Sequence, residues 1–127
     1  MRQTPSPSTV RSAAHRRGVW SEIWVAAYLW CRGYRLRARR YKTPVGEIDL
    51  IATRGRTLVF IEVKARPNLT EGLSAIAPSS YWRLAQAASL YVARHPTMND
   101  YRQRFDLVVV LPRGRIYHLD NIDVSRS

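Results

Sequence analysis

The segment GEIDLIATRGRTLVFIEVKA, residues 46–65, sets the expectation for the fold of this chain. It contains two apolar runs, residues 46–52 and 57–65, joined by the short glycine-containing loop Thr53–Arg56. Two such runs around a loop of this kind are typical of an antiparallel hairpin. Because apolar residues occupy both faces of each run, the two strands are expected to be central in a sheet that helices cover on both sides.

Three acidic residues, Glu47, Asp49 and Glu62, fall within these otherwise apolar runs, although the whole chain has only nine. Side chains alternate between the faces of a strand, so Glu47 and Asp49 should share one face. If Ala52 pairs with Thr57, Asp49 lies diagonal to Glu62, with Cα atoms about 7 Å apart or slightly more. The two carboxylates can then converge, whereas a register shifted by one residue would separate them.

Two carboxylates without His or Cys suit a hard divalent cation, Mg²⁺ or Mn²⁺, which prefers oxygen ligands. Such an ion neutralises a phosphodiester and lowers the pKa of its bound water. Lys64 follows Glu62 by two residues, so it should lie on the same face and can stabilise the charge that develops on phosphorus. The set predicts phosphodiester hydrolysis; the alternative is that the acids only form ion pairs with neighbouring Arg and Lys.

The net charge of the chain points to a polyanionic partner. Its 21 Lys and Arg residues against nine Asp and Glu residues give +12 on only 127 residues. Such a field attracts and steers nucleic acid, which is the leading candidate partner. Ribosome association, an anionic membrane surface and a generally basic composition are the alternatives.

Composition also predicts the domain organisation. Residues 1–12 are rich in Pro, Ser and Thr and are expected to form a disordered basic tail, whereas residues 13–127 form a single domain. The single Cys31 excludes an internal disulfide and is interpreted as a core thiol. No apolar run reaches the roughly 20 residues of a membrane span, and no secretory signal is recognisable, so we expect no membrane partner and a cytoplasmic location.

The segment before residue 46 predicts a helix and a strand. Apolar residues at helical spacing indicate a helix over Ala13–Arg32, with Trp20, Trp24 and Trp30 in its core-facing stripe. After Gly33, the apolar residues Tyr34, Leu36 and Ala38 alternate with Arg35, Arg37 and Arg39. This alternation is typical of a strand with one buried face and one cationic face that is available to phosphates.

The segment after residue 66 predicts one more helix and two more strands. Residues 67–80 have the composition of a loop, and Ser80–His95 has helical spacing that ends at Pro96. Residues 104–111 and 115–119 are expected as strands around the turn at Pro112–Gly114. The order α-β-β-β-α-β-β predicts an α/β fold, a mixed β-sheet flanked by helices.

The remaining polar residues give weaker signals. Glu22 lies at the margin of an apolar helical stripe, where it is either a fourth site carboxylate or a salt-bridge partner of a nearby Arg. Asp106 is interpreted as a residue at a strand terminus, and His118 as isolated from any catalytic partner. Trp82 is interpreted as a packing residue, with base stacking as the alternative.

Residues 16–66, RRGVWSEIWVAAYLWCRGYRLRARRYKTPVGEIDLIATRGRTLVFIEVKAR, resemble the YraN-like family of uncharacterised, endonuclease-related bacterial proteins. GEIDLI and FIEVKAR are the most specific parts, and the likeness extends to RFDLVVV at residues 104–110. That family is similar to Holliday-junction resolvases of the PD-(D/E)xK nuclease superfamily. The resemblance therefore implies a restriction-endonuclease-like fold.

The resemblance also implies residue roles. Asp49 and Glu62 would be metal ligands, with the backbone carbonyl of Val63 as a further ligand. Lys64 would be the catalytic lysine and Glu22 an auxiliary carboxylate. Glu47 matches the family motif without a settled role. At the start of the second predicted helix the family usually has a Lys, whereas this chain has Ser80, Tyr81 and Trp82, followed by Arg83.

Together, these features predict a metal-dependent endonuclease that acts on DNA, with branched DNA and a homodimer expected from the likeness to resolvases. The alternative is a nucleic-acid-binding protein that keeps the nuclease fold without catalysis. In either case, seven basic residues are the candidate nucleic-acid contacts: Arg35, Arg37, Arg39, Arg40, Lys42, Arg66 and Arg83.

Overall fold

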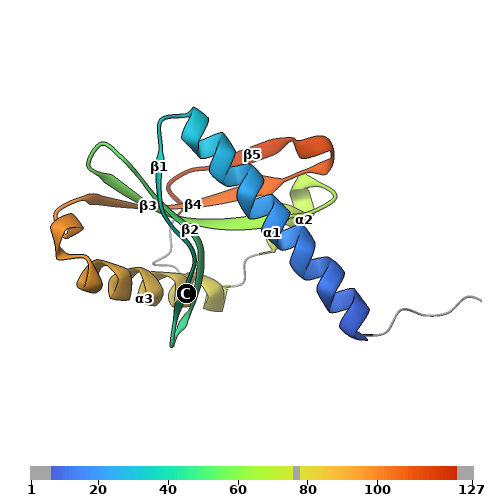
Figure 1. Ribbon diagram of the computed structural model, residues 1–127, viewed down its shortest axis with the longest axis horizontal. Helices are drawn as coiled ribbons and strands as arrows, with labels where there is room; N and C mark the ends of the chain where they lie inside the picture. The colour runs from blue at the N-terminus through green and yellow to red at the C-terminus, as the bar shows by residue number, and fades with distance from the viewer. Residues whose placement is uncertain (1–6, 76–77, 123–127) are drawn as a thin grey trace, which may run out of the picture.

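A computed structural model describes residues 7–75 and 78–122, with side chains for residues 18–75 and 81–122. Within these residues, one mixed sheet has the strand order β1-β2-β3-β4-β5 (Figure 1). Neighbouring strands are antiparallel except β3 and β4, which run parallel. The strands are β1 (Arg35–Thr43), β2 (Gly46–Arg54), β3 (Thr57–Ala65), β4 (Arg102–Val110) and β5 (Ile116–Leu119).

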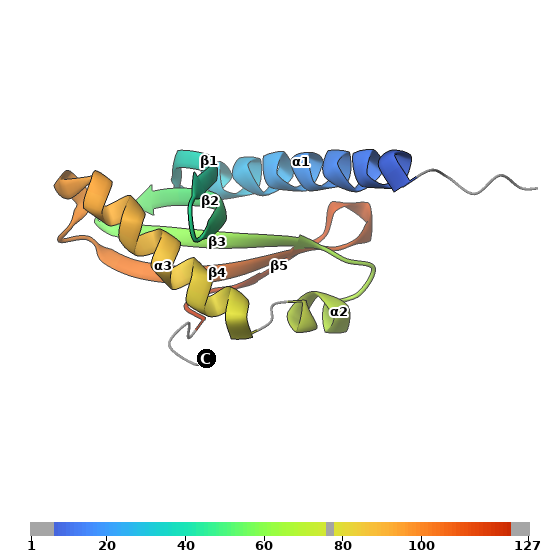
Figure 2. The ribbon, with the colours of Figure 1, turned by 90° about the horizontal axis from the view of Figure 1, so that it is seen from below.

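Helices cover both faces of the sheet. α1 (Pro7–Cys31) lies on one side, and α2 (Leu69–Ser74) and α3 (Pro78–Arg94) lie on the other (Figure 2). A parallel strand pair requires a long crossover connection, and α2, α3 and the 3₁₀ turn η1 (Pro96–Met98) provide it between β3 and β4. The β4–β5 connection contains a second 3₁₀ turn, η2 (Pro112–Gly114). The predicted α/β mixed sheet between helices is confirmed.

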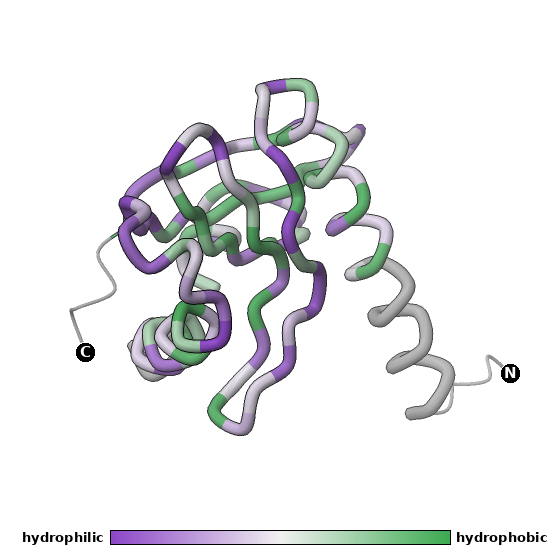
Figure 3. Tube along the Cα trace, turned by 60° about the vertical axis from the view of Figure 1, so that its left-hand side comes forward, coloured by the Kyte–Doolittle hydropathy of each residue, from purple (hydrophilic) through white to green (hydrophobic). Residues whose placement is uncertain are grey.

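The predicted hairpin is β2–β3, and it forms the centre of the sheet. Its apolar side chains divide between two buried clusters, one shared with α3 and one shared with α1. In Figure 3 the interior strands are largely green, that is, hydrophobic, whereas the edge strand β1 has purple, hydrophilic stretches. The α3 cluster includes Ile48, Ile51, Leu58 and Phe60, and the α1 cluster includes Leu50, Ala52, Val59 and Ile61.

The predicted register of this hairpin is wrong by two residues. Ala52 pairs with Val59, not with Thr57, and the ladder runs to Arg54–Thr57 at the turn. The loop has only two residues, Gly55 and Arg56, instead of the four that were predicted. Such a tight loop requires a left-handed residue, and Gly55 adopts this conformation, φ 59°, without strain. A shift of two residues keeps the paired residues 50–54 and 57–61 on their predicted faces and places Asp49 and Glu62 next to the last pair.

α1 differs from its prediction in extent and orientation. It begins at Pro7, so residues 7–12, predicted as part of the disordered tail, are helical, while residues 1–6 lie outside the described residues. Proline suits the first turn of a helix, where its missing N–H has no partner to lose. The side of α1 that packs on the sheet contributes Val25 and Leu29, both buried.

The three tryptophans of α1 and its cysteine are not core residues, contrary to prediction. Trp20, Trp24 and Trp30 are 70%, 51% and 76% exposed, and Cys31 is exposed as well. The helix has apolar residues on all sides, so hydrophobic spacing alone could not identify the face that packs on the sheet.

β1 departs from the predicted alternation. Its register against β2 shifts between Leu36 and Ala38, so one extra residue forms a β-bulge, and Leu36 is 44% exposed. Arg35 lies opposite Thr53, and Arg39 lies opposite Leu50. Because Thr53 and Leu50 are three positions apart, they point to opposite faces, and the arginines of β1 do not share the single cationic face that was predicted.

The predicted loop over residues 67–80 contains α2 and the start of α3. Asn68 caps α2, because its side-chain oxygen accepts a hydrogen bond from the backbone N–H of Glu71 at 2.9 Å. α3 begins at Pro78, two residues before the predicted start. No helix in the described part of the chain is long and apolar enough to cross a membrane.

Asp106 is a fully buried residue in the middle of β4, and its prediction as a strand-terminus acid is wrong. Arg104 Nε donates to its Oδ1 at 2.9 Å, and His118 Nε2 lies 2.7 Å from its Oδ2. The backbone N–H of Asn121 also donates to it. Burial alone would raise the pKa of Asp106, but these hydrogen bonds outweigh it and lower the pKa. Asp106 therefore joins β4, β5 and the segment after β5.

We predict that Asp106→Ala destabilises the protein by about 3–5 kcal/mol, because the substitution leaves the largely buried Arg104 without its counter-ion. Chemical denaturation gives the free energy of unfolding. Asp100→Ala is the matched control: Asp100 pairs with Arg56 on the surface, and its loss should cost less than about 1 kcal/mol. Similar losses for both variants would contradict a structural role for the buried pair.

Candidate active site

Asp49 and Glu62 lie on neighbouring strands at the end of the β2–β3 ladder. The last paired residues are Leu50 and Ile61, so Asp49 and Glu62 are the next residues beyond that pair. Beyond this pair, a side chain replaces the backbone as hydrogen-bond acceptor, because Asp49 Oδ2 accepts a hydrogen bond from the backbone N–H of Val63 at 2.9 Å. The two carboxylates are thus brought together, as the hairpin predicted.

The strand alternation is interrupted at Asp49. Ile48 and Ile51 belong to the same buried cluster under α3, although residues three apart in a regular strand point to opposite faces. Arg40, between the β1 residues that pair with Leu50 and Ile48, has a left-handed backbone, φ 54°. Asp49 is turned toward Val63 of β3 and toward α1, where Glu22 lies within electrostatic range.

Glu22 reaches the site from α1 and is only 6% exposed. Arg40 Nε donates to Glu22 Oε2 at 2.7 Å, and this hydrogen bond raises the pKa of Arg40. The carboxylates of Glu47 and Asp49 also act on Arg40 electrostatically. The salt-bridge alternative for Glu22 is therefore realised, and the ion pair sits beside the two hairpin acids.

Lys64 and Glu62 form an ion pair, with Lys64 Nζ 3.0 Å from Glu62 Oε1. Both side chains are half-buried, at 26% and 20% exposure. Lys64 also lines a cavity of about 330 Å³ together with Glu22, between α1 and the end of β3. The remaining lining residues are Gly18, Ser21, Val63, Ala65 and Arg66. All four side chains predicted as catalytic therefore lie in one neighbourhood.

The ionisation of Asp49 is strongly perturbed. Burial, followed by the negative charge of Glu62, raises the pKa of Asp49 to about 7. The hydrogen bond from Val63 and the charge of Lys64 offset only part of this effect. A second carboxylate, Glu22, adds to the repulsion. In the protein alone, burial and the neighbouring carboxylates thus disfavour the ionised form of Asp49.

A preformed cluster of three or more acidic, His or Cys ligands is absent from the described residues. The acids are instead a pair, Asp49 and Glu62, with Glu22 engaged by Arg40. Both carboxylates of the pair are oxygen donors of the kind that Mg²⁺ and Mn²⁺ prefer. The donor set fits such an ion, although its coordination sphere would need water or substrate oxygens as well.

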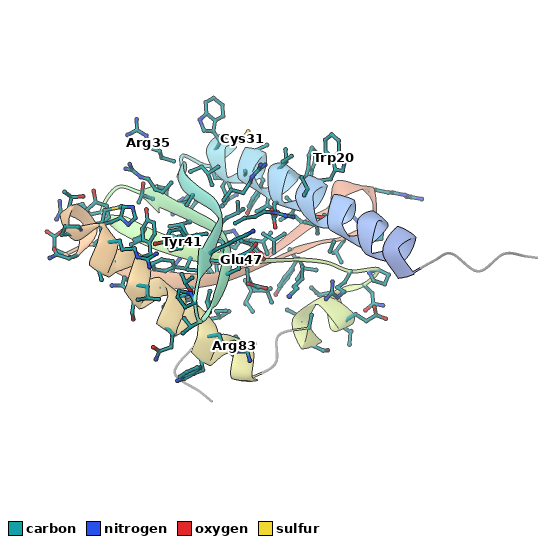
Figure 4. The ribbon with its side chains drawn as sticks, turned by 60° about the horizontal axis from the view of Figure 1, so that its bottom comes forward. Trp20, Cys31, Arg35, Tyr41, Glu47 and Arg83 are labelled. Atoms are coloured by element: carbon teal, nitrogen blue, oxygen red, sulfur yellow. The ribbon has the colours of Figure 1, made fainter. Side chains whose placement is uncertain are left out.

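The predicted nucleic-acid-binding residues lie in different places. Arg66 lines the cavity at the end of β3, and Arg40 is paired with Glu22. Lys42 and Arg83 both line an open groove of about 650 Å³ between the β1–β2 turn and the start of α3. Exposed Glu47 and Trp82 also line this groove, and Figure 4 labels Glu47 and Arg83.

Two details of the contacts were not predicted. An Arg partner for Glu22 was one alternative, but its identity as Arg40, which has a left-handed backbone without a glycine or asparagine signal, was not foreseen. His118, predicted as isolated, contacts Asp106 and lies 3.0 Å from the Tyr28 hydroxyl. Since Tyr28 and His118 are 90 residues apart, no local spacing could have revealed this contact.

The fold is similar to that of Hjc, a Holliday junction resolvase from the archaeal hyperthermophile Archaeoglobus fulgidus. The TM-score is 0.55 at 20% sequence identity, and the match covers 84% of this chain and 77% of that chain. At this identity the likeness concerns the fold, and it supports the restriction-endonuclease-like architecture that the family resemblance implied.

Sequence comparison finds much nearer relatives. A protein of Chelativorans sp. is 45% identical over 117 residues, which cover 91% of this chain and 94% of the relative. A protein of Mesorhizobium japonicum is 44% identical and covers 95% and 97%, and one of Rhodopseudomonas palustris is 42% identical and covers 91% and 89%. All three are named UPF0102 proteins. Residues 21–110 match the corresponding family model, so the predicted relationship is confirmed and the chain belongs to the uncharacterised protein family UPF0102.

Proposed function

We propose that this protein is a metal-dependent nucleic-acid phosphodiester hydrolase, an endonuclease that acts on DNA. The observation that supports the proposal most directly is the meeting of Asp49 and Glu62, next to Lys64, on a fold similar to that of a resolvase. Branched DNA as substrate, a homodimeric state and a cytoplasmic location are finer expectations, which come from the resemblance and from composition.

Asp49 and Glu62 would hold Mg²⁺ or Mn²⁺, with the backbone carbonyl of Val63 as the further ligand that the resemblance implies. The raised pKa of Asp49 supports this assignment, because two carboxylates that repel each other in a partly buried place are stabilised by a shared cation. When bound, the ion supplies positive charge against the phosphodiester and makes water more acidic.

The protein's own groups would orient the reactants. The Val63 N–H fixes one oxygen of Asp49, which leaves the other oxygen free to act as a ligand. Lys64, held by Glu62, would donate a hydrogen bond to the attacking water or to the phosphate oxygen on which charge develops. Glu22 would keep the Arg40 guanidinium beside the acids, where it can contact a phosphate.

The basic residues around the site would bind the nucleic-acid backbone. Lys42, Arg66 and Arg83 border the two hollows next to the acids, and Arg35, Arg37 and Arg39 add exposed cations on β1, although not all on one face. Contacts of this kind position a nucleic acid without reading its bases. Affinity is therefore expected to fall steeply as salt concentration rises.

A non-catalytic nucleic-acid-binding protein is the second candidate, and one observation favours it. Glu22 and Glu62 already have cationic partners, Arg40 and Lys64, so part of the acidic charge is balanced without a metal. In this case, the protein would bind DNA equally well with and without a divalent ion.

We predict that the protein binds Mn²⁺ and Mg²⁺ and cleaves DNA, and that Asp49→Asn and Glu62→Gln each lower cleavage at least about 100-fold. Metal binding is followed by isothermal titration calorimetry, and cleavage is followed on linear and four-way-junction duplexes. Glu71→Gln, which removes an exposed glutamate of α2, is the control and should cleave like the wild type.

Lys64→Ala separates the two candidate functions further. If the protein is a hydrolase, Lys64→Ala should still bind metal and DNA but should no longer cleave, because Lys64 would act on the reacting atoms. If the wild type cleaves none of these substrates and binds them unchanged in the presence of a chelator, the hydrolase proposal is wrong and the binding protein remains.

Asp49 should also make the stability of the metal-free protein depend on pH. Because its pKa is about 7 in the folded state and near 4 when unfolded, the folded state binds the proton more tightly, and stability falls as pH rises through this window. Asn retains an oxygen that accepts from Val63 but cannot ionise. In chelator, Asp49→Asn should therefore exceed the wild type in stability at pH 8, by roughly 4 kcal/mol.

Denaturant unfolding at a series of pH values measures this difference. It should shrink as the pH falls and vanish near pH 3, below both pKa values of Asp49, and Glu71→Gln should show no comparable change with pH. A constant difference between Asp49→Asn and wild type from pH 4 to pH 8 would show that Asp49 does not titrate in this range.

A further inference from the structure

α1 exposes an apolar surface on the side away from the sheet. We call it the α1 outer face; Figure 4 labels Trp20 and Cys31 on it, and Figure 3 shows green bands along the described half of the helix. Its residues recur every three or four positions, so they form one continuous stripe. They are Trp20, Ile23, Trp24, Ala27, Trp30 and Cys31, all exposed. Trp24 lies at the edge of this face, where its Nε1–H donates to the Gly114 carbonyl at 2.8 Å.

No charged side chain is exposed between residues 18 and 31, the part of α1 with described side chains. The one charged residue there, Glu22, is 6% exposed and paired with Arg40. The complete chain carries a net charge of +12, so an uncharged face of this length is a marked departure from its composition. Without cations it offers nothing to phosphates, but two copies can meet on it without opposing like charges.

The exposed area of this face is large for a protein that remains monomeric. A buried tryptophan covers about 150–250 Å², so the three exposed indoles, with Ile23 at 40% and neighbouring Leu36 at 44% exposure, offer roughly 600 Å². Two copies would remove about 1,200 Å² from water, which reaches the lower range of stable, specific interfaces. Apolar patches of this size commonly mark interaction sites.

The order of large and small residues favours an antiparallel pairing of two α1 helices about a twofold axis near residues 25–26. In that arrangement, Trp24 of one copy lies opposite Ala27 of the other, and Trp20 lies opposite Cys31. At these two pairs of positions a large side chain meets a small one, which allows close packing. Parallel pairing would instead oppose tryptophan to tryptophan.

We propose that the α1 outer face is a homodimer interface, in which two copies of this chain pack through antiparallel α1 helices. Trp20, Trp24 and Trp30 are its central contacts, as expected for an interface in which a few aromatic residues carry most of the binding energy. The proposal does not depend on whether the protein cuts DNA, since it rests on exposure, charge and shape alone.

Sedimentation equilibrium over a wide range of protein concentrations tests the proposal. The wild type should reach twice the 14.7 kDa mass of one chain. The double variant Trp20→Lys/Trp30→Lys should remain monomeric at the same concentrations, with a dimer dissociation constant raised at least about 100-fold by the charges introduced into the interface. Far-UV circular dichroism and thermal unfolding confirm that it is folded.

Trp82→Lys is the matched control, because Trp82 is 54% exposed but lies on α3, on the other side of the sheet. It should dimerise like the wild type. A wild type that stays monomeric at all concentrations, a folded double variant that still dimerises, or a Trp82→Lys variant that is equally impaired would each overturn the proposal.

The single cysteine allows a second test on the unmodified protein. Cys31 lies within the proposed interface, so its reaction rate with a thiol reagent should fall as protein concentration rises and dimers form. In Trp20→Lys/Trp30→Lys the rate should be independent of concentration. Equal rates across the concentrations at which the wild type associates would place the interface elsewhere and overturn the assignment to α1.

Discussion

The hydrogen bond from the Val63 N–H to Asp49 is the interaction on which the geometry of the site depends. At this point the β2–β3 ladder ends at Leu50–Ile61, and a side-chain oxygen replaces a backbone carbonyl as the acceptor for β3. Asp49 is thereby held against the neighbouring strand and next to Glu62. The repulsion between the two acids is a direct consequence of a hairpin that aligns them and of helices that cover both faces of the sheet.

Much of this arrangement could be predicted because it is encoded locally. The two apolar runs, the glycine in the loop and the period of two were enough to predict the hairpin, its central place in the sheet and the convergence of Asp49 with Glu62. The register was wrong by two residues, since the loop length depends on a single left-handed residue, Gly55. The convergence was still predicted correctly, because the actual register places Asp49 and Glu62 directly beyond the last pair and the Asp49 side chain turns toward β3.

Other features depend on contacts between distant parts of the chain, and these could not be predicted from spacing. Asp106 is buried because Arg104, His118 and the backbone of Asn121 surround it, and two of these partners lie beyond the end of its strand. α1 illustrates a different difficulty. Its apolar residues surround the helix, and only the packed structure shows that Val25 and Leu29 face the sheet while the tryptophans do not.

The backbone of Arg40 has a consequence for engineering this protein. A left-handed conformation costs a side-chain-bearing residue about 1–2 kcal/mol relative to the right-handed one, and glycine is the residue that adopts it without strain. Yet the guanidinium of Arg40 is the partner of buried Glu22. At position 40, the backbone conformation thus favours glycine, whereas the charge of Glu22 requires arginine. A search for more stable variants that ranks substitutions by backbone conformation would select Arg40→Gly. This substitution would leave the buried carboxylate of Glu22 without its cation.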